Sequence, residues 1–589
     1  MWAAHDGAGL ALAGADNRVR RLPSFPLPPR RVGASTMTEN QPPTDDELRR
    51  TAAGRFGFDE WREGQFEAVQ AAATGRDVLA VMPTGHGKSA VYQVPAAALD
   101  AVTVVVSPLI ALQRDQVDAL NETLGAGRAV ALNSTLGARA ERRAWEALED
   151  GEARFVFLAP EQIAREDTLA RLAGLRPDLF VVDEAHCISA WGHDFRPDYL
   201  TLGGAVERLG HPTTVALTAT ASPQTRAEIV AKLGLVDPLV LVQSFDRPNL
   251  TLRVTRHATD GEKRAAVLDE VAELGGPGLV YAATRRASED YADALAQRGL
   301  RAEAYHSGRR AADRASVHAR FLGNELDVVV ATTAFGMGID KPDVRFVVHA
   351  DIPDSLDSYY QEIGRAGRDG YPALAVLHYR SEDLGLQRFF AGGSVAEGHL
   401  AAVFDAVRGA GPARPTALRS ETGLSARAQS RALALLEASG AVRGGRHGFQ
   451  AVDGVGRPDA VERAVAEEDA RRRVDTSRVE MARGYAETDL CRRQWLLNYF
   501  GEDAPAWCGN CDRCEETGSR EQAREREDAT PGGWSMQDPV RHRDWGPGLV
   551  MGVEPDRITV LFDSVGYREL ALAAIEDNEG LLVRGGASD

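Results

Sequence analysis

The segment that decides the fold is Met82-Pro83-Thr84-Gly85-His86-Gly87-Lys88-Ser89, which follows an apolar run and precedes a helical pattern. A loop between a buried strand and a helix presents backbone N–H groups and the positive end of the helix to a phosphate. The glycines let the backbone approach that phosphate, Lys88 is placed between the β and γ phosphates, and Ser89 offers a hydroxyl to magnesium. The expected nucleotide contacts in this segment are Thr84, Gly85, Gly87, Lys88 and Ser89. The segment begins with Met where the usual phosphate-loop pattern begins with Gly, and an ordinary strand–helix turn is the alternative.

Lysine is rare in this chain, which makes the lysine of this loop informative. The chain has 68 basic residues, and its only lysines are Lys88, Lys232, Lys263 and Lys341. A guanidinium does not substitute for a compact ammonium between phosphates. A lysine kept at this position in an arginine-rich chain therefore favours phosphate binding.

A second polar group follows another apolar run, in Leu179-Phe180-Val181-Val182-Asp183-Glu184-Ala185-His186. Ligands of open α/β sheets bind at the carboxyl ends of the strands, so this strand delivers two carboxylates to the edge where the phosphate loop lies. Asp183 is expected to hold magnesium, and Glu184 is expected to orient and deprotonate the attacking water. An acidic helix N-terminus is the alternative explanation, and the phosphate loop argues against it.

The rest of the chain divides into segments of different composition. Short apolar runs alternate with helical patterns twice in succession, as in two α/β units whose parallel strands are buried on both faces. Three helical patterns and a Gly-rich wing come next, then a helical segment with cysteines, a charged linker and short strands typical of a small β-barrel. The expected boundaries are 1–43 for a disordered Pro-rich extension, 44–240 and 241–392 for the two lobes, 398–455 for the winged-helix-like unit, 456–515 for the cysteine segment, 516–535 for the linker and 536–585 for the barrel.

Composition excludes some classes of protein. Hydrophobic residues make up 44% of the 589 positions and charged residues 26%, as in globular proteins. No apolar run reaches the ~18 residues of a membrane span, and the start of the chain lacks a signal-peptide pattern. We therefore expect a cytoplasmic, bacterial nucleoid-associated protein with no membrane partner. The net charge of −18 does not exclude a DNA partner, because affinity for a polyanion depends on the local field in a groove.

Four of the five cysteines form a cluster in the sequence, at Cys491, Cys508, Cys511 and Cys514, and Cys187 stands alone. In a cytosolic chain this spacing favours metal binding over disulfides. Four thiolates provide the closed tetrahedral coordination of structural zinc, with an iron–sulfur cluster as the competing interpretation. The isolated Cys187 is expected to be a buried core residue.

These residues together resemble a known family. Asp183-Glu184-Ala185-His186 is similar to the DEAH box of superfamily 2 helicases, and residues 187–197 resemble the aromatic-rich loop of RecQ helicases, with Ala190 where Gln is common. The cysteine cluster resembles the RecQ zinc-binding subdomain. Other blocks that agree in order and spacing are Phe56-Gly57-Phe58 with Arg62 and Gln65, Ser107-Pro108-Leu109-Ile110, Ala159-Pro160-Glu161, Thr218-Ala219-Thr220-Ala221, residues 331–342 and residues 361–368. The resemblance to RecQ-type ATP-dependent DNA helicases covers residues 50–392 and 470–515.

The resemblance implies two tandem RecA-like lobes that bind ATP and Mg²⁺ between them, besides Zn²⁺ at the cysteines. It implies 3′-to-5′ movement on single-stranded DNA and unwinding of forked DNA in repair, recombination or replication. It assigns adenine recognition to Arg62 and Gln65, and an arginine finger to Arg368, with Arg365 as its neighbour on the far lobe. Aromatic faces and arginine stack on unpaired bases, so it assigns coupling to DNA to an exposed loop and two threonines. The residues assigned to coupling are His186, Trp191, Phe195, Arg196, Thr218 and Thr220.

The C-terminal region departs from the family pattern. The winged-helix-like segment comes before the cysteine cluster, whereas in many RecQ proteins a winged helix comes after it. Residues 540–550 and 558–563 resemble the Tudor-like barrel of UvrD-like helicases, which suggests docking to RNA polymerase or another protein, or a capping unit without a partner. The competing functions are a superfamily 2 RNA helicase and a non-enzymatic nucleic-acid or RNA-polymerase docking protein.

Overall fold

The computed structural model describes residues 42–585, apart from residues 84, 134–135, 190–195, 336–340, 392–394, 446–447, 522–532, 555 and 563. The expectations of a disordered extension at 1–43 and a linker at 516–535 lie largely outside the described residues. None of the described helices combines the length and apolar character that a bilayer crossing requires.

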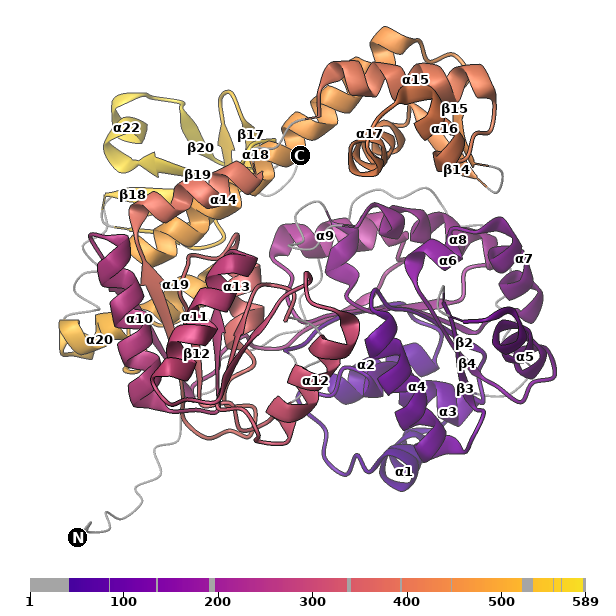
Figure 1. Ribbon diagram of the computed structural model, residues 1–589, viewed down its shortest axis with the longest axis horizontal. Helices are drawn as coiled ribbons and strands as arrows, with labels where there is room; N and C mark the ends of the chain where they lie inside the picture. The colour runs from indigo at the N-terminus through magenta and orange to yellow at the C-terminus, as the bar shows by residue number, and fades with distance from the viewer. Residues whose placement is uncertain are drawn as a thin grey trace.

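The first lobe is a seven-stranded parallel sheet in the order β3-β4-β2-β5-β6-β1-β7. Its central strands are short apolar runs that are buried along their whole length, because helices cover both faces (Figure 1). The strands are β1 (Val78–Val81), β2 (Thr103–Val106), β3 (Ala129–Leu132), β4 (Phe155–Leu158), β5 (Leu179–Val182), β6 (Thr213–Thr218) and β7 (Leu239–Val242). The helices are α1 (Asp45–Phe56), α2 (Gln65–Ala73), α3 (Ala90–Leu99), α4 (Ile110–Leu124), α5 (Ala138–Glu149), α6 (Pro160–Ile163), α7 (Glu166–Leu175), α8 (Leu202–Arg208) and α9 (Pro223–Leu233), with 3-10 turns η1 (Ala185–Ile188) and η2 (Pro197–Thr201).

The second lobe repeats this plan with a six-stranded parallel sheet in the order β10-β11-β9-β12-β13-β8. The strands are β8 (Leu250–Arg256), β9 (Gly278–Tyr281), β10 (Ala302–Tyr305), β11 (Val328–Ala331), β12 (Phe346–His349) and β13 (Ala373–Tyr379). The helical elements are α10 (Asp260–Leu274), α11 (Arg285–Gln297), α12 (Ala311–Leu322), α13 (Leu356–Ile363), η3 (Ser381–Asp383) and α14 (Leu384–Ala391). The first sheet extends through β7, two residues beyond the expected lobe boundary at 240, because β7 pairs with β1.

A winged-helix-like unit follows the second lobe. It consists of α15 (Glu397–Ala410), α16 (Pro415–Thr422), α17 (Ala426–Ala438) and the antiparallel pair β14 (Val442–Gly445) and β15 (Gly448–Ala451). The helix α18 (Arg457–Glu487) leaves this unit and spans 31 residues, or about 46 Å. Ala460 and Ala464 of α18 pack in the core of the winged-helix-like unit, whereas Val474, Val479 and Tyr485 pack in the main core. A boundary at 456 therefore divides a core that the start of α18 completes.

The chain ends in a cysteine-bearing helical unit and an antiparallel sheet. The helices are α19 (Arg492–Tyr499) and α20 (Asp512–Thr517). The sheet has the order β19-β18-β17-β16-β20 and is built from β16 (Pro539–His542), β17 (Gly546–Val553), β18 (Arg557–Phe562), β19 (Gly566–Ala571) and β20 (Leu582–Arg584), with α22 (Leu572–Asp577) between the last two. The described strands pair as an open five-stranded sheet with its own apolar core, and no ladder joins β19 to β20 among them. The predicted fold class, two RecA-like lobes with additional C-terminal units, is confirmed.

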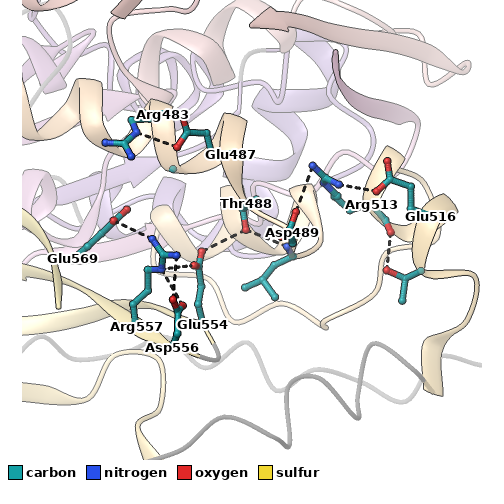
Figure 2. A pocket seen from close by; sticks show the side chains of 13 residues that line it. Arg483, Glu487, Thr488, Asp489, Arg513, Glu516, Glu554, Asp556, Arg557 and Glu569 are labelled. Carbon is teal, nitrogen blue, oxygen red and sulfur yellow. Dashed lines mark hydrogen bonds and ion pairs between the residues drawn. The ribbon is translucent and has the colours of Figure 1, made fainter. Parts of the chain in front are cut away.

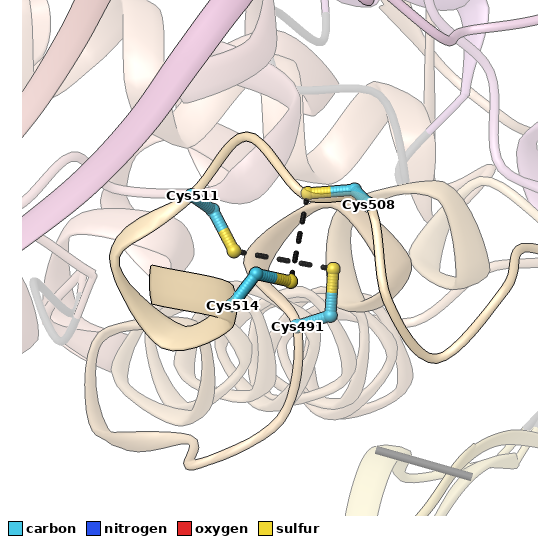
Figure 3. Close-up of side chains that lie close together, drawn as sticks. All are labelled: Cys491, Cys508, Cys511 and Cys514. Atoms are coloured by element: carbon cyan, nitrogen blue, oxygen red, sulfur yellow. Dashed lines mark hydrogen bonds between the residues drawn. The ribbon is translucent and has the colours of Figure 1, made fainter. Parts of the chain in front are cut away.

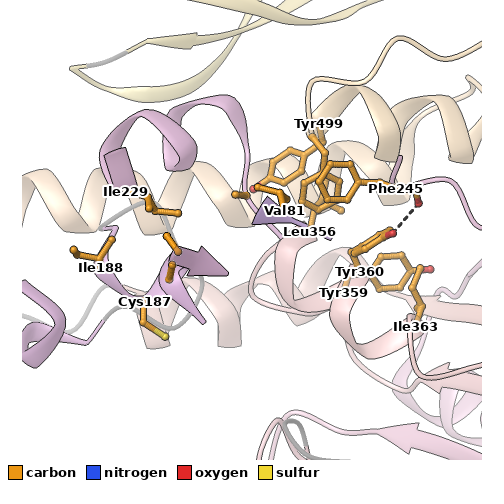
Figure 4. Packing of buried hydrophobic residues seen from close by; sticks show 14 of the residues in the cluster. Val81, Cys187, Ile188, Ile229, Phe245, Leu356, Tyr359, Tyr360, Ile363 and Tyr499 are labelled. Atoms are coloured by element: carbon orange, nitrogen blue, oxygen red, sulfur yellow. Dashed lines mark hydrogen bonds between the residues drawn. The ribbon is translucent and has the colours of Figure 1, made fainter. Parts of the chain in front are cut away.

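An aromatic cluster joins the two lobes to the cysteine unit (Figure 4). Phe245 lies in the connection between the lobes and stacks on Phe500 of the cysteine unit, with ring centroids 4.5 Å apart. Tyr360 of α13 packs edge-on against both rings, and its hydroxyl donates to the carbonyl of Phe245 at 2.7 Å. Aromatic pairs of this geometry stabilise packing beyond the area that they bury. The cysteine unit is thus part of the core that holds the lobes.

Candidate functional site

The loop after β1 has the backbone that the sequence predicts for phosphate binding. Gly85 and Gly87 adopt φ values of +80° and +75°, a conformation that residues with a Cβ rarely adopt. A Cβ at Gly87 would lie 2.9 Å from Nε2 of Gln65, so a larger residue there would displace the Gln65 amide. The ammonium of Lys88 donates to the Met82 carbonyl at 3.3 Å, and Ser89 immediately precedes α3. The predicted contact Thr84 lies outside the described residues.

Two amides hold this loop. Gln65 accepts from the backbone N–H of Arg62 at 3.1 Å and donates to the carbonyl of Gly87 at 3.0 Å, so its amide joins the entry segment to the loop. His86 contacts Oε1 of Gln243 through Nδ1 at 3.1 Å, and burial, followed by the charge of Arg62, lowers the pKa of His86. No motif in the sequence indicates the contact between His86 and Gln243.

The carboxylates lie at the end of β5, next to the loop. Asp183 is buried, with 9% of its surface exposed, and accepts from the backbone N–H of Glu184 at 3.0 Å and from the hydroxyl of Ser107 at 3.4 Å. Burial and the charge of Glu184 raise the pKa of Asp183 to about 6, although the ammonium of Lys88 opposes this shift. The predicted phosphate and magnesium ligands of the first lobe are therefore brought together.

Glu184 has a strained backbone. Its φ of +49° is in the left-handed region, which costs a residue with a side chain ~1–3 kcal/mol and is common at functional sites. The side chain points to His186, with 3.3 Å between Oε2 and Nδ1. The hydroxyl of Tyr199 donates to the Asp183 carbonyl at 3.0 Å and fixes the peptide between the two carboxylates.

A line of hydrogen bonds leads from the carboxylates to the second lobe. His186 contacts the Thr218 hydroxyl at 2.9 Å, and that hydroxyl donates to the Thr220 carbonyl at 3.0 Å. The amide of Gln361, on α13 of the second lobe, donates to the Thr220 hydroxyl at 3.2 Å. Gln361 is the first residue of the block at residues 361–368, and the sequence alone assigns no role to its side chain. The structure makes it the residue that joins that motif to the predicted coupling threonines.

The predicted arginines follow Gln361 at the end of α13. Arg365 is buried, and its Nε has no hydrogen-bond partner among the described residues. Arg368 donates to the Gly364 carbonyl at 3.4 Å. Arg247, in the connection between the lobes, donates to the carbonyls of Gly364, Ala366 and Gly367, and its charge contributes to the lowered pKa of His86. Arg247 thus lies between the arginine segment and the phosphate loop.

The predicted DNA-coupling loop is described only at its two ends. Trp191 and Phe195 lie outside the described residues. Arg196 donates to the Pro108 carbonyl at 3.1 Å, which ties one end of the loop to the segment after β2. Cys187, at the other end, is fully buried in the main core, which confirms that it is a core residue.

The four clustered cysteines meet at one point (Figure 3). Their Sγ atoms all lie within 4.8 Å of one another, with 3.9 Å between Cys508 and Cys514 and 4.0 Å between Cys511 and Cys491. Zinc–sulfur bonds of about 2.3 Å in a tetrahedron place sulfur atoms ~3.8 Å apart. The four sulfur atoms are therefore close enough to one another to bind a single zinc ion.

The helical unit that carries the cysteines (α19 and α20), called the zinc unit from here on, is attached to the second lobe. Arg492 is fully buried and pairs with Asp512 at 3.1 Å, while Arg493 donates to the Leu250 carbonyl at 2.6 Å. Asn510, inside the CxxCxxC turn, donates to the carbonyls of Pro248 and Leu250 at 3.0 and 3.1 Å. These contacts fix the zinc unit to the start of β8.

A cavity of about 790 Å³ lies between the end of α18, the zinc unit and the C-terminal sheet, and chain neighbours of Cys491 and Cys514 help to line it (Figure 2). Its walls are charged, and several of its carboxylates already pair with arginine. Arg557 contacts Glu554, Asp556 and Glu569, and Arg513 contacts Glu516. These pairs make the cavity a polar seam between units.

Comparison with known proteins agrees with this geometry. The chain matches the DEAD/DEAH box helicase family over residues 62–229, the helicase conserved C-terminal domain over 262–370 and the RecQ zinc-binding family over 458–515. The probable ATP-dependent DNA helicase RecS of Bacillus subtilis is 41% identical over 341 residues, which are 58% of this chain and 68% of that protein. The ATP-dependent DNA helicase RecQ of Pasteurella multocida is 35% identical over 460 residues, which are 78% of this chain and 61% of that protein.

A solved structure shares the fold. The crystal structure of the DUF1998 helicase MrfA bound to DNA and AMPPNP superimposes with a TM-score of 0.50 at 19% identity, covering 60% of this chain and 53% of that chain. The likeness is one of fold alone, because the two sequences are only 19% identical.

Removal of one zinc ligand is expected to empty the zinc site. Purified protein should contain about one zinc per chain, and Cys508→Ser should contain well under half, with a lower melting temperature, because zinc binding contributes to folding. Metal analysis by mass spectrometry measures the content. The matched control is Cys187→Ser, which should keep its zinc, since Cys187 lies outside the cluster. A brown protein that contains iron would instead establish an iron–sulfur cluster.

The raised pKa of Asp183 predicts a pH-dependent effect of its removal. The carboxylate has an unperturbed pKa of 3.8 and a folded pKa of about 6, so its ionisation destabilises the metal-free fold as the pH rises from 3.8 through 6. Without magnesium and nucleotide, Asp183→Asn should be more stable than the wild type at pH 7.5, by up to about 3 kcal/mol. The difference should vanish near pH 4. Thermal melts across this range measure it, and a difference that does not vary with pH would contradict the assignment.

Proposed function

The chain belongs to the RecQ family of helicases, and on this premise we propose that it is an ATP-dependent DNA helicase that hydrolyses Mg-ATP between its two lobes. The observation that carries the proposal is the continuous contact from phosphate loop to arginine segment. Lys88 and Asp183 lie together in the first lobe, and Gln361 connects the coupling threonines to the helix that ends at the arginines. The aligned relatives are longer than the aligned region, so activity and substrate are proposals for the whole protein.

The residues of this chain have defined tasks in the proposed reaction. Lys88 neutralises the β and γ phosphates, and Ser89 and Asp183 hold magnesium, which when bound offsets the phosphate charge. Glu184 orients the attacking water and accepts its proton. Arg365 and Arg368 approach the γ phosphate when the lobes close, so that hydrolysis depends on closure. Arg62 and Gln65 contact adenine, which requires the Gln65 amide to exchange its contact with Gly87 for the base.

We infer that the moving strand is single-stranded DNA, bound across both lobes and translocated 3′ to 5′. The described end of the aromatic-rich loop, at Arg196, contacts Pro108 in the segment after β2, which supports a nucleic-acid path over this face. The winged-helix-like unit carries exposed arginines on a separate body, at positions 414, 419 and 443, and these are suited to a duplex backbone. The C-terminal sheet is proposed as a docking unit for RNA polymerase or another protein.

ATP hydrolysis that depends on DNA tests the function. We expect single-stranded DNA to stimulate ATP turnover at least tenfold over the basal rate, and RNA to stimulate it far less. Lys88→Ala should lower the stimulated rate by at least 100-fold, because it removes the ammonium between the phosphates. The measurement is steady-state phosphate release with matched DNA and RNA oligonucleotides.

Three outcomes would contradict the proposal. Equal or stronger stimulation by RNA favours the superfamily 2 RNA helicase. Unchanged turnover in Lys88→Ala removes the phosphate-site assignment, and no turnover in the wild type favours a non-enzymatic binding protein. An Arg286→Ala variant is the control for loss of a cationic side chain, because Arg286 is 91% exposed and pairs with Asp290 on α11 of the second lobe.

Polarity is tested on tailed duplexes. We expect unwinding of duplexes with a 3′ single-stranded tail and little unwinding of those with a 5′ tail, because 3′-to-5′ movement brings the motor to the junction only from a 3′ tail. Strand displacement measured by fluorescence quantifies both. Unwinding that requires the 5′ tail would reverse the assignment.

A further inference from the structure

The tip of the zinc unit, residues 499–502, contacts both lobes and the connection between them. On the second lobe, the hydroxyl of Tyr499 donates to the carboxylate of Asp357, and the ring of Phe500 packs on Tyr360. On the connection between the lobes, Glu502 accepts from the hydroxyl of Ser244 at 2.6 Å and from a backbone N–H at 2.8 Å. The tip therefore contacts the connection between the lobes, residues 243–249, which is the hinge for any movement of one lobe against the other.

The contact of the tip with the first lobe is small. The guanidinium of Arg226, on α9, donates to the Phe500 carbonyl at 2.7 Å. Pro223, at the start of α9, lies so close to Gly501 that a Cβ there would meet it at 2.7 Å. The attachment to the second lobe is larger, since it includes the contacts of Arg493 and Asn510 with β8. When the lobes move, the zinc unit is expected to stay with the second lobe, and the contact with α9 is the one that breaks.

The C-terminal sheet also contacts the tip, next to the small contact between the tip and α9. Gln537, just before β16, donates from its amide to the Gly501 carbonyl at 2.5 Å. Its φ of +64° is in the left-handed region, and its backbone N–H donates to Val550 at 2.8 Å, so the sheet holds a strained residue directed at the tip. Strain of this kind persists only where the surrounding structure enforces it.

A tyrosine pair makes a second connection. Tyr567 of β19 stacks on Tyr499, with ring centroids 5.4 Å apart, and both side chains are buried. Burial raises the pKa of Tyr567, whereas the hydroxyls of Tyr499 and Ser222 lower it. Ser222 precedes α9 and follows the coupling threonines, so the tyrosine of the C-terminal sheet lies beside the first lobe at its coupling segment.

We propose that the C-terminal sheet is a brace on the interlobe hinge, in which Gln537 and Tyr567 are positioning residues that hold the zinc-unit tip against α9 and restrain lobe closure in the absence of DNA. The proposal concerns regulation of the ATP site and rests on the proposed function. The C-terminal sheet would then regulate the chain that carries it, because displacement of the sheet would remove the restraint on lobe closure.

The test weakens the brace from two sides in the full-length protein. Gln537→Asn tolerates the left-handed backbone and keeps an amide, but the Asn side chain is one methylene too short to contact the Gly501 carbonyl. Tyr567→Phe removes only the hydroxyl. This double variant should raise the DNA-independent rate of ATP hydrolysis at least threefold while the DNA-stimulated rate changes less than twofold. The change should appear in kcat and not in KM, because the nucleotide contacts are intact.

A second variant approaches the same contact from the first lobe. Arg226→Gln leaves the C-terminal sheet untouched and should raise the basal rate in the same way. Tyr371→Phe is the control for loss of a tyrosine hydroxyl, because its side chain is 67% exposed on the second lobe, and its rates should match the wild type. Melting temperature and zinc content establish that each variant is folded.

Hydrogen exchange separates this proposal from the proposed function. Amides in residues 243–249 should exchange several-fold faster in both the double variant and Arg226→Gln, whether or not the protein hydrolyses ATP. Wild-type exchange and a wild-type basal rate in the folded double variant would overturn the brace. An effect in the double variant that Arg226→Gln fails to reproduce would overturn it too. A wild type without ATP turnover would instead contradict the helicase function, and the exchange data would still decide the brace.

Discussion

The hydrogen bond from Gln361 to Thr220, 3.2 Å long, joins the two lobes directly, and the site proposed between the lobes depends on it. Thr220 is buried at the carboxyl edge of the first sheet, and Gln361 lies in the last turn of α13 in the second lobe. A buried polar group costs free energy when it loses its partner, so lobe movement cannot separate these residues without replacing their contact. Contacts from Thr218 to His186 and from His186 to Glu184 connect this hydrogen bond between the lobes to the carboxylates.

The zinc unit is part of the core that joins the two lobes. Its metal loop is attached to β8, its aromatic Phe500 fills the space between the hinge and α13, and Glu502 caps the hinge backbone. Four thiolates around one ion hold a segment of few residues in a fixed shape, which a small apolar core cannot do alone. Metal binding and lobe geometry are therefore linked in one structure.

The helix α18 explains how a winged-helix-like unit can precede the zinc unit in the chain. One end of this helix completes the core of the winged-helix-like unit, and the other end packs in the main core beside Tyr359 through Tyr485. A continuous helix transmits position over about 46 Å without a flexible joint. In Figure 1 it carries α15, α16 and α17 away from the zinc unit and over the first lobe.

Sequence alone determined the local chemistry of this protein. The alternation of apolar runs with helical patterns gave both sheets, because strands buried on two faces must be apolar throughout, and the spacing of the cysteines gave the zinc site. The sequence also brought out the loop at residues 82–89 and the Asp183–Glu184 pair, because the residue types in both are those that a phosphate or a metal ion would require. Only the tertiary structure decided the hydrogen bonds between distant segments. These join Gln243 to His86, Gln361 to Thr220, Arg247 to the arginine segment and Gln537 to Gly501. These contacts join residues far apart in the chain, and amides and guanidinium groups pair with whatever acceptor the fold presents. No spacing in the sequence therefore encodes them.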